Sequence, residues 1–568
     1  IAIAAVFYLW QLGRPDIITD ESSIATRAIG MVDFDFGIEQ PTPWQWVDNI
    51  PWWMRLSFHD HPPLVFLAQN FSMRLFGQTP FAIRLPSVLA GLAAVWLVYL
   101  IGKNLYSPAV GLSSAAIFAF TVNHVWISRI GLQESVLIAL MLSSAYFFFK
   151  AYPLSVPIDY PIDTDSNGLK KSNRKSNVWL YLASFLLGLA FLAKYNALIL
   201  VPIFASIFVL QRGANKAVGL YSRRDFLQIS IAALIFLAIA SPIIIYNIQL
   251  YRNFGHFDFQ FSLLARQNVT EWQSRPGQEV LGSFENRLKT YFPRLVEANS
   301  PYFLALSVIG FAMIARQLIR LQGNKKTVNS EQDSGLLTAH RFLLVTFLWL
   351  LPFLIFIGPA HRFFTILTPW LAISAGYALI VMGNNFIHYR GLTSIVITAA
   401  LAVEILYSYN SVIILDPIGS KLWAYSYLHR QSLSSGFNQL NAYLSSELKG
   451  KMPETAITFE FPFARELLKQ SMDRGRSQGL EAVPVGIVYN DNINLSTQLW
   501  VLLKRITYSG WPVVSAENFI AAGGQKFFSD SGIKKIYFIN ATVRALQDRT
   551  RPPTAYGDIL EARIVNAG

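Results

Sequence analysis

Long apolar runs separated by shorter polar connections dominate residues 1–412. A helix needs about 20 mainly apolar residues to cross the hydrocarbon core of a membrane. The run at 1–12 is too short to span and fits the end of a first helix. Longer runs lie at 82–102, 108–127, 133–152, 178–193, 196–211, 226–248, 301–319, 342–359, 363–382 and 392–412. The pattern predicts a polytopic α-helical membrane protein with about eleven transmembrane helices.

Two connections are long, at 14–80 and 249–300, and the first contains amphipathic stretches near 22–31 and 62–77. After residue 412 the apolar runs give way to mixed sequence. Short β-like runs lie at Ala456–Phe461, Val483–Val488 and Lys535–Ile539, between helix-like stretches such as Phe463–Gln470. The sequence therefore predicts a membrane domain at 1–412 and a soluble α/β domain at 413–568.

The composition agrees with a membrane protein. Hydrophobic residues make up 53% of the 568 residues and charged residues only 14%, whereas soluble proteins have about 25% charged residues. The 14% of aromatic residues excludes a disordered chain. Because the chain has no Cys, disulfides, Cys-ligated zinc, iron–sulfur clusters and a thiol nucleophile are excluded.

The net charge of +13 suggests either nucleic-acid binding or a membrane orientation signal. The basic residues gather in every second connection, at 153–177, 212–225 and 320–341. By the positive-inside rule these connections are cytoplasmic. The acidic segment 14–80 then lies outside, together with 249–300 and the C-terminal domain. We therefore expect a multi-pass protein of the cytoplasmic (inner) membrane that does not bind nucleic acid.

Ionisable residues near membrane spans are costly and often functional. Asp20 and Glu21 open an amphipathic stretch on the outer side, where they also fit an ordinary helix start. His61, just before Pro62 and Pro63, fits a helix mouth but also a simple packing role. Arg84 at the start of a span also fits a snorkelling anchor. Taken singly, none of these residues defines a site.

Lys194 and Arg362 are basic residues on the acidic side, which suggests an anionic ligand such as a phosphate. Gln133 and Glu134 lie in the same outer layer. Together the layer combines acids (Asp20, Glu21, Glu134) with bases (His61, Lys194, Arg362). A lipid-phosphate substrate needs such an arrangement: apolar helices for its tail, cations for its phosphate and a carboxylate for the transferred group.

Several segments resemble the GT-C glycosyltransferases, in particular the branch of protein mannosyltransferases and aminoarabinose transferases. They are Asp20-Glu21, His61-Pro62-Pro63-Leu64, Phe81-Ala82-Ile83-Arg84-Leu85-Pro86-Ser87, Leu192-Ala193-Lys194-Tyr195, and Arg362-Phe363 through Pro369. The resemblance covers residues 1–412 in motif order and hardly touches the C-terminal domain. It implies an inverting transfer of sugar from a polyprenyl-phosphate donor to an acceptor hydroxyl at the outer face.

The resemblance also implies roles for individual residues. Asp20 would be the general base, supported by Glu21. Donor-phosphate binding would fall to His61, Arg84, Lys194 and Arg362, and acceptor or sugar binding to Gln133, Glu134 and Tyr195. The chain departs from relatives in having His61 in place of Lys, Glu134 in place of Asp, and Tyr195 in place of Gly.

No cofactor is expected, and no spacing compels a metal site. His59 and His61 could offer ligands, but Pro62 restricts their geometry. The sugar is not specified, and lipid, glycan and protein acceptors stay open. The alternatives are a transporter or flippase of lipid-linked sugars, although the charges lie at one face and no internal repeat is visible, and a GT-C-like ligase or polymerase of another branch.

Overall fold

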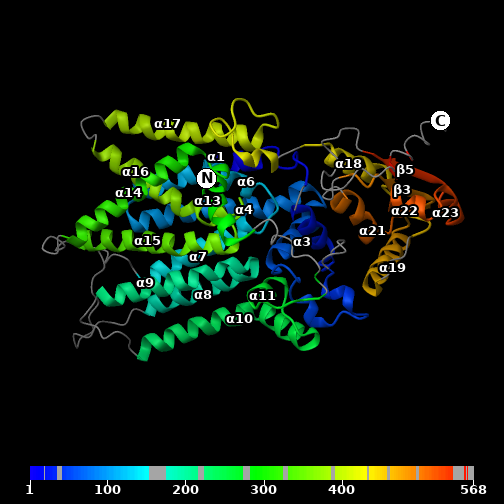
Figure 1. Cartoon of the computed structure of the whole chain (residues 1–568), viewed down its shortest axis with the longest axis horizontal. Coiled ribbons are helices and arrows are strands. Elements are labelled where there is room, and N and C mark those ends of the chain that lie inside the picture. The colour runs from blue at the N-terminus through cyan, green and yellow to red at the C-terminus, as the bar shows by residue number, and fades with distance from the viewer. Residues whose placement is uncertain are drawn as a thin grey trace.

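The computed structural model describes residues 1–17, 20–34, 41–152, 174–214, 223–270, 272, 282–323, 331–385, 390–431, 434–456, 461–493, 498–540, 556–557 and 560. Long helices form one part of the molecule, on the left of Figure 1, and a smaller α/β part lies at the right-hand end. This division agrees with the change of pattern in the sequence near residue 412.

The first half of the helical part contains both amphipathic stretches and the first apolar runs. Its elements are α1 (Ala2–Leu9), α2 (Asp20–Gly30), η1 (Pro43–Trp46), η2 (Trp52–Arg55), α3 (Leu64–Phe76), α4 (Pro80–Leu105), α5 (Pro108–Phe120), α6 (Val122–Ser128), α7 (Glu134–Ala151), α8 (Arg174–Ala193), η3 (Tyr195–Ile199), α9 (Leu200–Ala214) and α10 (Arg223–Phe254). The starts of α4 and α5 follow the rule that Pro fits the first helical turn behind a capping hydroxyl. Thr79 and Ser107 accept hydrogen bonds from the backbone N–H groups of Ala82 and Val110, each at 3.2 Å.

The second half of the helical part completes the bundle. Its elements are α11 (Phe259–Leu264), α13 (Phe284–Glu297), α14 (Pro301–Gly323), α15 (Glu331–Ile357), η4 (Phe363–Ile366), α16 (Thr368–Asn385), α17 (Arg390–Ser408), η6 (Tyr409–Ile413) and η7 (Tyr427–Gln431). At Gly310 an added Cβ would collide with the carbonyl oxygen of Ser374, so α14 and α16 lie backbone to backbone. Small residues permit such close approach of membrane helices.

Among the described residues, six helices are long and apolar enough to cross a membrane: α4, α7, α10, α14, α15 and α17. Helices α5 and α6 form a further candidate span that is bent by 63°. Shorter apolar helices cover Asn177–Ala193, Tyr195–Leu210 and Thr368–Gly383. The predicted apolar runs are therefore helical, and the chain is a multi-pass membrane protein. The count of eleven spans stays a prediction.

The C-terminal part combines short parallel strands with helices. Its elements are α18 (Phe437–Glu447), β1 (Lys451–Pro453), α19 (Pro462–Ser477), β2 (Glu481–Val483), β3 (Val485–Tyr489), η8 (Gln498–Leu503), α21 (Lys504–Ser509), β4 (Val513–Ser515), α22 (Ala516–Ala521), α23 (Gln525–Asp530) and β5 (Lys535–Ile539). Strands β4, β3 and β5 form a three-stranded parallel sheet in that order, and β1 pairs with β2. This is the expected α/β pattern.

Of the three strands predicted in this part, two are present in the structure and one lies largely outside the described residues. The run 535–539 coincides with β5, and the run 483–488 covers the end of β2 and most of β3. The strand expected at Ala456–Phe461 lies largely outside the described residues, since 457–460 are not described. The helix expected at Phe463–Gln470 is part of α19.

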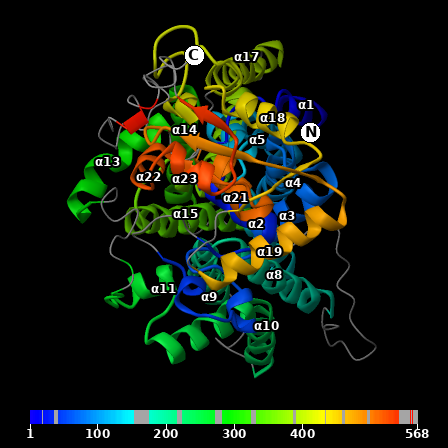
Figure 2. The ribbon, with the colours of Figure 1, turned by 90° about the vertical axis from the view of Figure 1, so that its right-hand side faces the viewer.

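The α/β part is anchored to the segment that leads into α2. The carboxylate of Asp16 accepts hydrogen bonds from the backbone N–H groups of Ser435 at 2.5 Å and Asn438 at 2.8 Å. The Tyr508 hydroxyl donates to the carbonyl oxygen of Thr26 within α2, at 2.8 Å. Figure 2 shows α19 and α21 in front of the helical part, beside α2. Helix α2 is therefore held between the two parts.

Candidate active site

A chain of alternating charges joins three parts of the bundle that lie far apart in sequence. Asp20 is the first residue of α2, and its carboxylate forms an ion pair with Arg362 just before η4. The Nε atom of Arg362 lies 3.7 Å from Oε1 of Glu134, the first residue of α7. The same Glu134 oxygen lies 2.5 Å from Nζ of Lys194, at the end of α8. Four of the residues selected from the sequence thus form one ionic chain.

Burial differs along this ionic chain. The Glu134 side chain is 1% exposed and that of Lys194 is 11% exposed, whereas the Asp20 side chain is 48% exposed. The ring of Phe363 lies under both cations, 5.0 Å from Nζ of Lys194 and 5.3 Å from Cζ of Arg362. A buried charge that loses its partner is strongly destabilising. The two acids and two bases therefore hold each other in place, and Asp20 is the member most open to solvent.

Glu21 and Arg84 form a separate, fully buried pair. Arg84 donates to both oxygens of Glu21, at 2.7 Å each, and to the carbonyl oxygens of Leu12, Pro15 and Asp16, at 2.9 Å each. These bonds use all five N–H donors of a guanidinium group. Oε1 of Glu21 also accepts the backbone N–H of Gly131 at 2.6 Å. Both side chains thus tie α2 and α4 to the loop before α7, beside the ionic chain.

Gln133 precedes α7, next to Glu134, and is 1% exposed, but its side chain forms no capping hydrogen bond. No described residue accepts a hydrogen bond from its side-chain amide nitrogen. Tyr195 follows Lys194 and donates from its hydroxyl to Oδ2 of Asp258 at 2.6 Å. Both residues therefore flank the ionic chain along the sequence.

An apolar cavity of about 480 Å³ lies between α8, α10 and α11. Its lining residues are Phe191, Ile243, Ile244, Asn247, Ile248, Phe257, Phe261, Leu264 and Ala265. Two of these rings contact Tyr195: the ring centroid of Phe191 is 5.2 Å away and that of Phe261 is 5.0 Å away. The apolar cavity therefore reaches the segment that carries Lys194.

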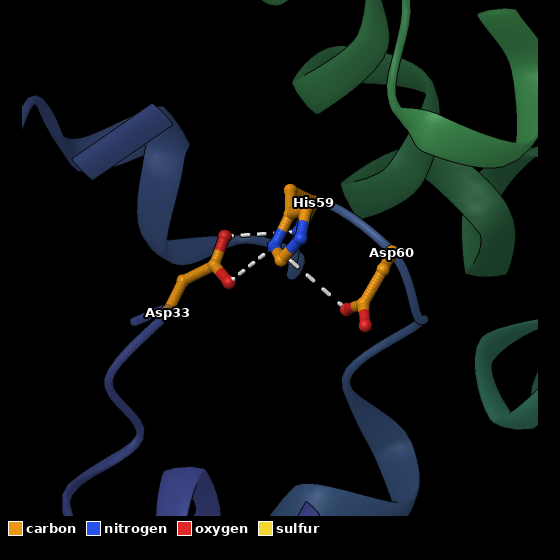
Figure 3. A group of neighbouring side chains, drawn as sticks. All are labelled: Asp33, His59 and Asp60. Atoms are coloured by element: carbon orange, nitrogen blue, oxygen red, sulfur yellow. Dashed lines mark hydrogen bonds and ion pairs between the residues drawn. The ribbon is translucent and has the colours of Figure 1, made fainter. Parts of the chain in front are cut away.

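A second ionic group lies in the connection before α3. Figure 3 shows His59 between Asp33 and Asp60. Nδ1 of His59 is 2.7 Å from Oδ1 of Asp33 and 3.8 Å from Oδ1 of Asp60. Arg27 of α2 donates to both oxygens of Asp60, at 2.8 and 3.0 Å. His61 joins the same group, with Nδ1 2.9 Å from Oδ2 of Asp60. His61 therefore shares Asp60 with Arg27 and His59.

The ligating atoms of Asp33, His59 and Asp60 lie within 4.8 Å of one another, close enough to share a metal ion. However, the Arg27 guanidinium already binds Asp60 and lies 3.7 Å from Asp33. Burial would lower the pKa of His59, but the carboxylates of Asp33 and Asp60 raise it to about 9. Burial would raise the pKa of Asp60, but Arg27 and the two histidines hold it well below its usual value. Within the protein, Asp33 and Asp60 thus face Arg27 and His59.

Some residues of this layer are not evident from the sequence. Arg27 and Asp33 contribute to the second ionic group, and Asp258 connects Tyr195 to α11. The backbone N–H of Phe259 donates to the carbonyl oxygen of His59 at 2.9 Å, which links the two regions. The only sequence signal for Arg27 and Asp33 is their place in the long acidic connection.

One family model and one curated relative match parts of this chain. The family described as dolichyl-phosphate-mannose-protein mannosyltransferase matches residues 60–155. A putative mannosyltransferase of Bacillus subtilis (strain 168), YkcB, is 25% identical over 193 residues, or 33% of this chain. The match spans 23% of the length of that relative.

Two solved structures are similar over most of the chain. The oligosaccharyltransferase of Archaeoglobus fulgidus, in complex with Zn and sulfate, gives a TM-score of 0.50 at 12% identity, covering 90% of this chain and 61% of that one. ArnT from Cupriavidus metallidurans, bound to undecaprenyl phosphate, gives a TM-score of 0.48 at 13% identity. The match covers 92% of this chain and 90% of the ArnT chain. The chain therefore shares the fold of that archaeal oligosaccharyltransferase, which agrees with the GT-C fold expected from the motifs. Within that class, its residues 60–155 are similar to the protein mannosyltransferase family.

Proposed function

We propose that this protein is an inverting glycosyltransferase that moves a sugar from a polyprenyl phosphate to an acceptor hydroxyl at the outer face of the cytoplasmic membrane. The observation that carries the proposal is the ionic chain of Asp20, Arg362, Glu134 and Lys194 beside an apolar cavity. A prenyl-phosphate sugar has the matching parts: an apolar tail, an anionic phosphate and a reactive sugar carbon.

The donor phosphate would bind to Lys194 and Arg362. Both cations now face carboxylates, and Glu134 Oε1 lies 2.5 Å from one and 3.7 Å from the other. An incoming phosphate would take over those partners, since charged hydrogen bonds to Lys and Arg suit phosphate oxygens. The prenyl tail would lie in the apolar cavity, whose Phe191 is one helical turn before Lys194. The role of His61 in donor binding stays a prediction from the sequence, since its ion pair is with Asp60 of the second ionic group.

Asp20 would act as the general base. Its carboxylate is partly exposed and is held only by Arg362 among the ion pairs of the described residues. When the phosphate occupies Arg362, Asp20 is released to accept the proton of the acceptor hydroxyl. The acceptor oxygen forms a bond to the sugar C1 as the bond from C1 to the phosphate oxygen breaks. The charge of the leaving phosphate then falls on Lys194 and Arg362, where it is stabilised.

The remaining residues would shape the site. Glu21 and Arg84 fix the start of α2 and thereby aim Asp20, because every N–H donor of Arg84 is bonded within the protein. We assign acceptor or sugar binding to Gln133, Glu134 and Tyr195, which lie next to the two cations. The acceptor is a lipid, glycan or protein of the cell envelope.

The test is transfer of radiolabelled mannose from undecaprenyl phosphate to cell-envelope extract by the purified full-length chain. Asp20→Asn should lower the rate ~10²–10⁴-fold, the usual effect of losing a general base, without lowering the unfolding temperature. Asp48→Asn, at an exposed acid in the same connection, is the matched control and should transfer normally. Transfer at the wild-type rate by Asp20→Asn would refute the mechanism. Movement of the intact lipid-linked sugar across vesicles without any transfer would favour a flippase.

A further inference from the structure

A second cavity lies in the α/β part, among α18, α19 and α21. Its volume is about 350 Å³. Four cationic residues line it, namely Lys451, Arg474, Lys504 and Arg505. None of the described residues that line it is an Asp or a Glu. The described lining of the cavity therefore carries basic side chains and no acidic one.

Lys504 is the residue that the fold leaves least compensated. It is 7% exposed, and its Nζ atom lies 3.8 Å from the ring centroid of Trp500. No described oxygen accepts a hydrogen bond from its ammonium group within the protein. Burial, with the charge of Arg505 beside it, holds the pKa of Lys504 well below its usual value. Contact with an aromatic face offsets only part of the free energy that burial of a cation costs.

Arg505 contributes charge from a fixed position. Its Nη2 donates to the Asn441 carbonyl oxygen and to the Ser445 hydroxyl, at 3.0 Å each, and its Nη1 donates to the Val501 carbonyl oxygen. These bonds pin the guanidinium to η8 and α18. Lys504 thus supplies the free donors of the cavity and Arg505 supplies a fixed positive charge.

The neutral lining residues indicate the rest of the ligand. Trp511 and Tyr508 offer aromatic surface, and Ser509 offers a hydroxyl group. Aromatic faces with polar groups between them suit the mixed apolar and hydroxyl surface of a sugar ring. A cavity of this volume lies in the range of small-molecule sites, about 300–1,000 Å³.

We propose that this cavity binds an anionic saccharide, a sugar-sized ligand that carries a phosphate or a carboxylate group. The anionic group would lie against Lys504, with Arg474 at the exposed edge of the cavity and the sugar ring against Trp511. The proposal uses none of the residues of the ionic chain, so it does not depend on the proposed transfer reaction.

Calorimetric titration of the purified full-length chain tests this site. All proteins would carry Lys194→Met, which removes the proposed contact to donor phosphate. The probes are glucose 6-phosphate, glucuronate, inorganic phosphate and neutral glucose. At least one charged sugar should bind more tightly than glucose, and adding Lys504→Met should weaken it ~10-fold or more. Lys469→Met, at an exposed lysine of α19 outside the cavity, is the matched control and should not change the affinity.

Without ligand, Lys504→Met should unfold at the same temperature as its parent or a higher one, because it removes a buried cation. If Lys504→Met fails to fold, Arg474→Gln at the exposed edge of the cavity should weaken the binding of the same charged sugar. Glucose binding as tightly as the charged sugars, unchanged affinity in both variants, or no binding of any charged sugar would each overturn the proposal. Inorganic phosphate binding as tightly as glucose 6-phosphate would refute its saccharide part.

Discussion

Lys194 and Glu134 should have opposite effects on the binding of a polyprenyl phosphate. The two side chains share a bond of 2.5 Å in the ligand-free protein. A phosphate that binds Lys194 must therefore compete with the Glu134 carboxylate. Removing the cation removes a contact to the phosphate, whereas removing the charge on Glu134 removes the competitor.

The expected magnitudes follow from the type of bond. A hydrogen bond to a charged group contributes about 1.5–3 kcal/mol. Lys194→Met should therefore weaken the binding of the phosphate ~10- to 150-fold. Glu134→Gln keeps the shape of the side chain and replaces a charged acceptor with a neutral one, a difference of about 1 kcal/mol. Glu134→Gln should therefore tighten the binding of the phosphate ~5-fold. The same change leaves Lys194 buried beside a neutral amide, which should lower the unfolding temperature.

The assay is titration of the detergent-solubilised full-length chain with farnesyl phosphate, a short and soluble prenyl phosphate. Lys103→Met, at an exposed lysine near the end of α4, serves as the matched control and should leave the dissociation constant unchanged. The reasoning would be refuted if Glu134→Gln weakened the binding of farnesyl phosphate as much as Lys194→Met does. That result would make Glu134 a residue that orders Lys194 rather than one that competes with the ligand.

Two further predictions concern the buried ionic groups. Arg84→Met should lower the free energy of unfolding by ~3–5 kcal/mol, because it leaves Glu21 buried without its cation. Denaturation of the detergent-solubilised protein measures this loss. Arg74→Met, at an exposed arginine, is the control, and an equal loss in the two variants would contradict the prediction. The pKa of His59 is raised to about 9, so its bond to Asp33 should stabilise the protein fully below about pH 6.5 and lose that effect as the pH rises through 9. His59→Asn should remove this fall in unfolding temperature between pH 7 and 10, and an unchanged pH profile would show that another group causes it.

The helices of the membrane part could be predicted because burial in lipid demands long apolar runs, and each predicted run is helical. The bend between α5 and α6 was not predicted, although Thr121, Asn123 and His124 interrupt the apolar run 108–127 at that place. The structure places the break at Thr121, whose backbone is extended. The residue type alone does not force a break there.

The sequence analysis selected several residues that the structure brings close together, but it did not indicate how they pair. Lys194 and Arg362 are evident as cations in an acidic layer, and both lie in the ionic chain. Arg84 looks equally suited to a phosphate, yet it is 63 residues from Glu21, the carboxylate that takes it. Pairing across such a distance depends on the packing of α2 against α3 and α4, and no local pattern encodes it.

The α/β part was the least predictable in detail. Its strands β1, β2 and β4 have three residues each, too short for a clear alternation of apolar and polar positions. Lys504 and Arg505 look like an ordinary surface pair in the sequence, and only the packing of α21 buries them. The sequence gives no sign of a cavity at that place.

The charges of the ionic chain suggest how donor binding and base activation are connected. Asp20 and Glu134 together offer two negative charges to the two cations, so a phosphate must displace a carboxylate to enter. Asp20 is the more exposed of the two and moves into water at the smaller cost. In the proposed mechanism, its release would leave it free to accept a proton only when the donor is bound. Asp20→Asn should therefore bind farnesyl phosphate as tightly as the wild type or more tightly, while it loses transfer. An inactive Asp20→Asn protein with weakened phosphate binding would contradict this order of events and make Asp20 a donor-binding residue.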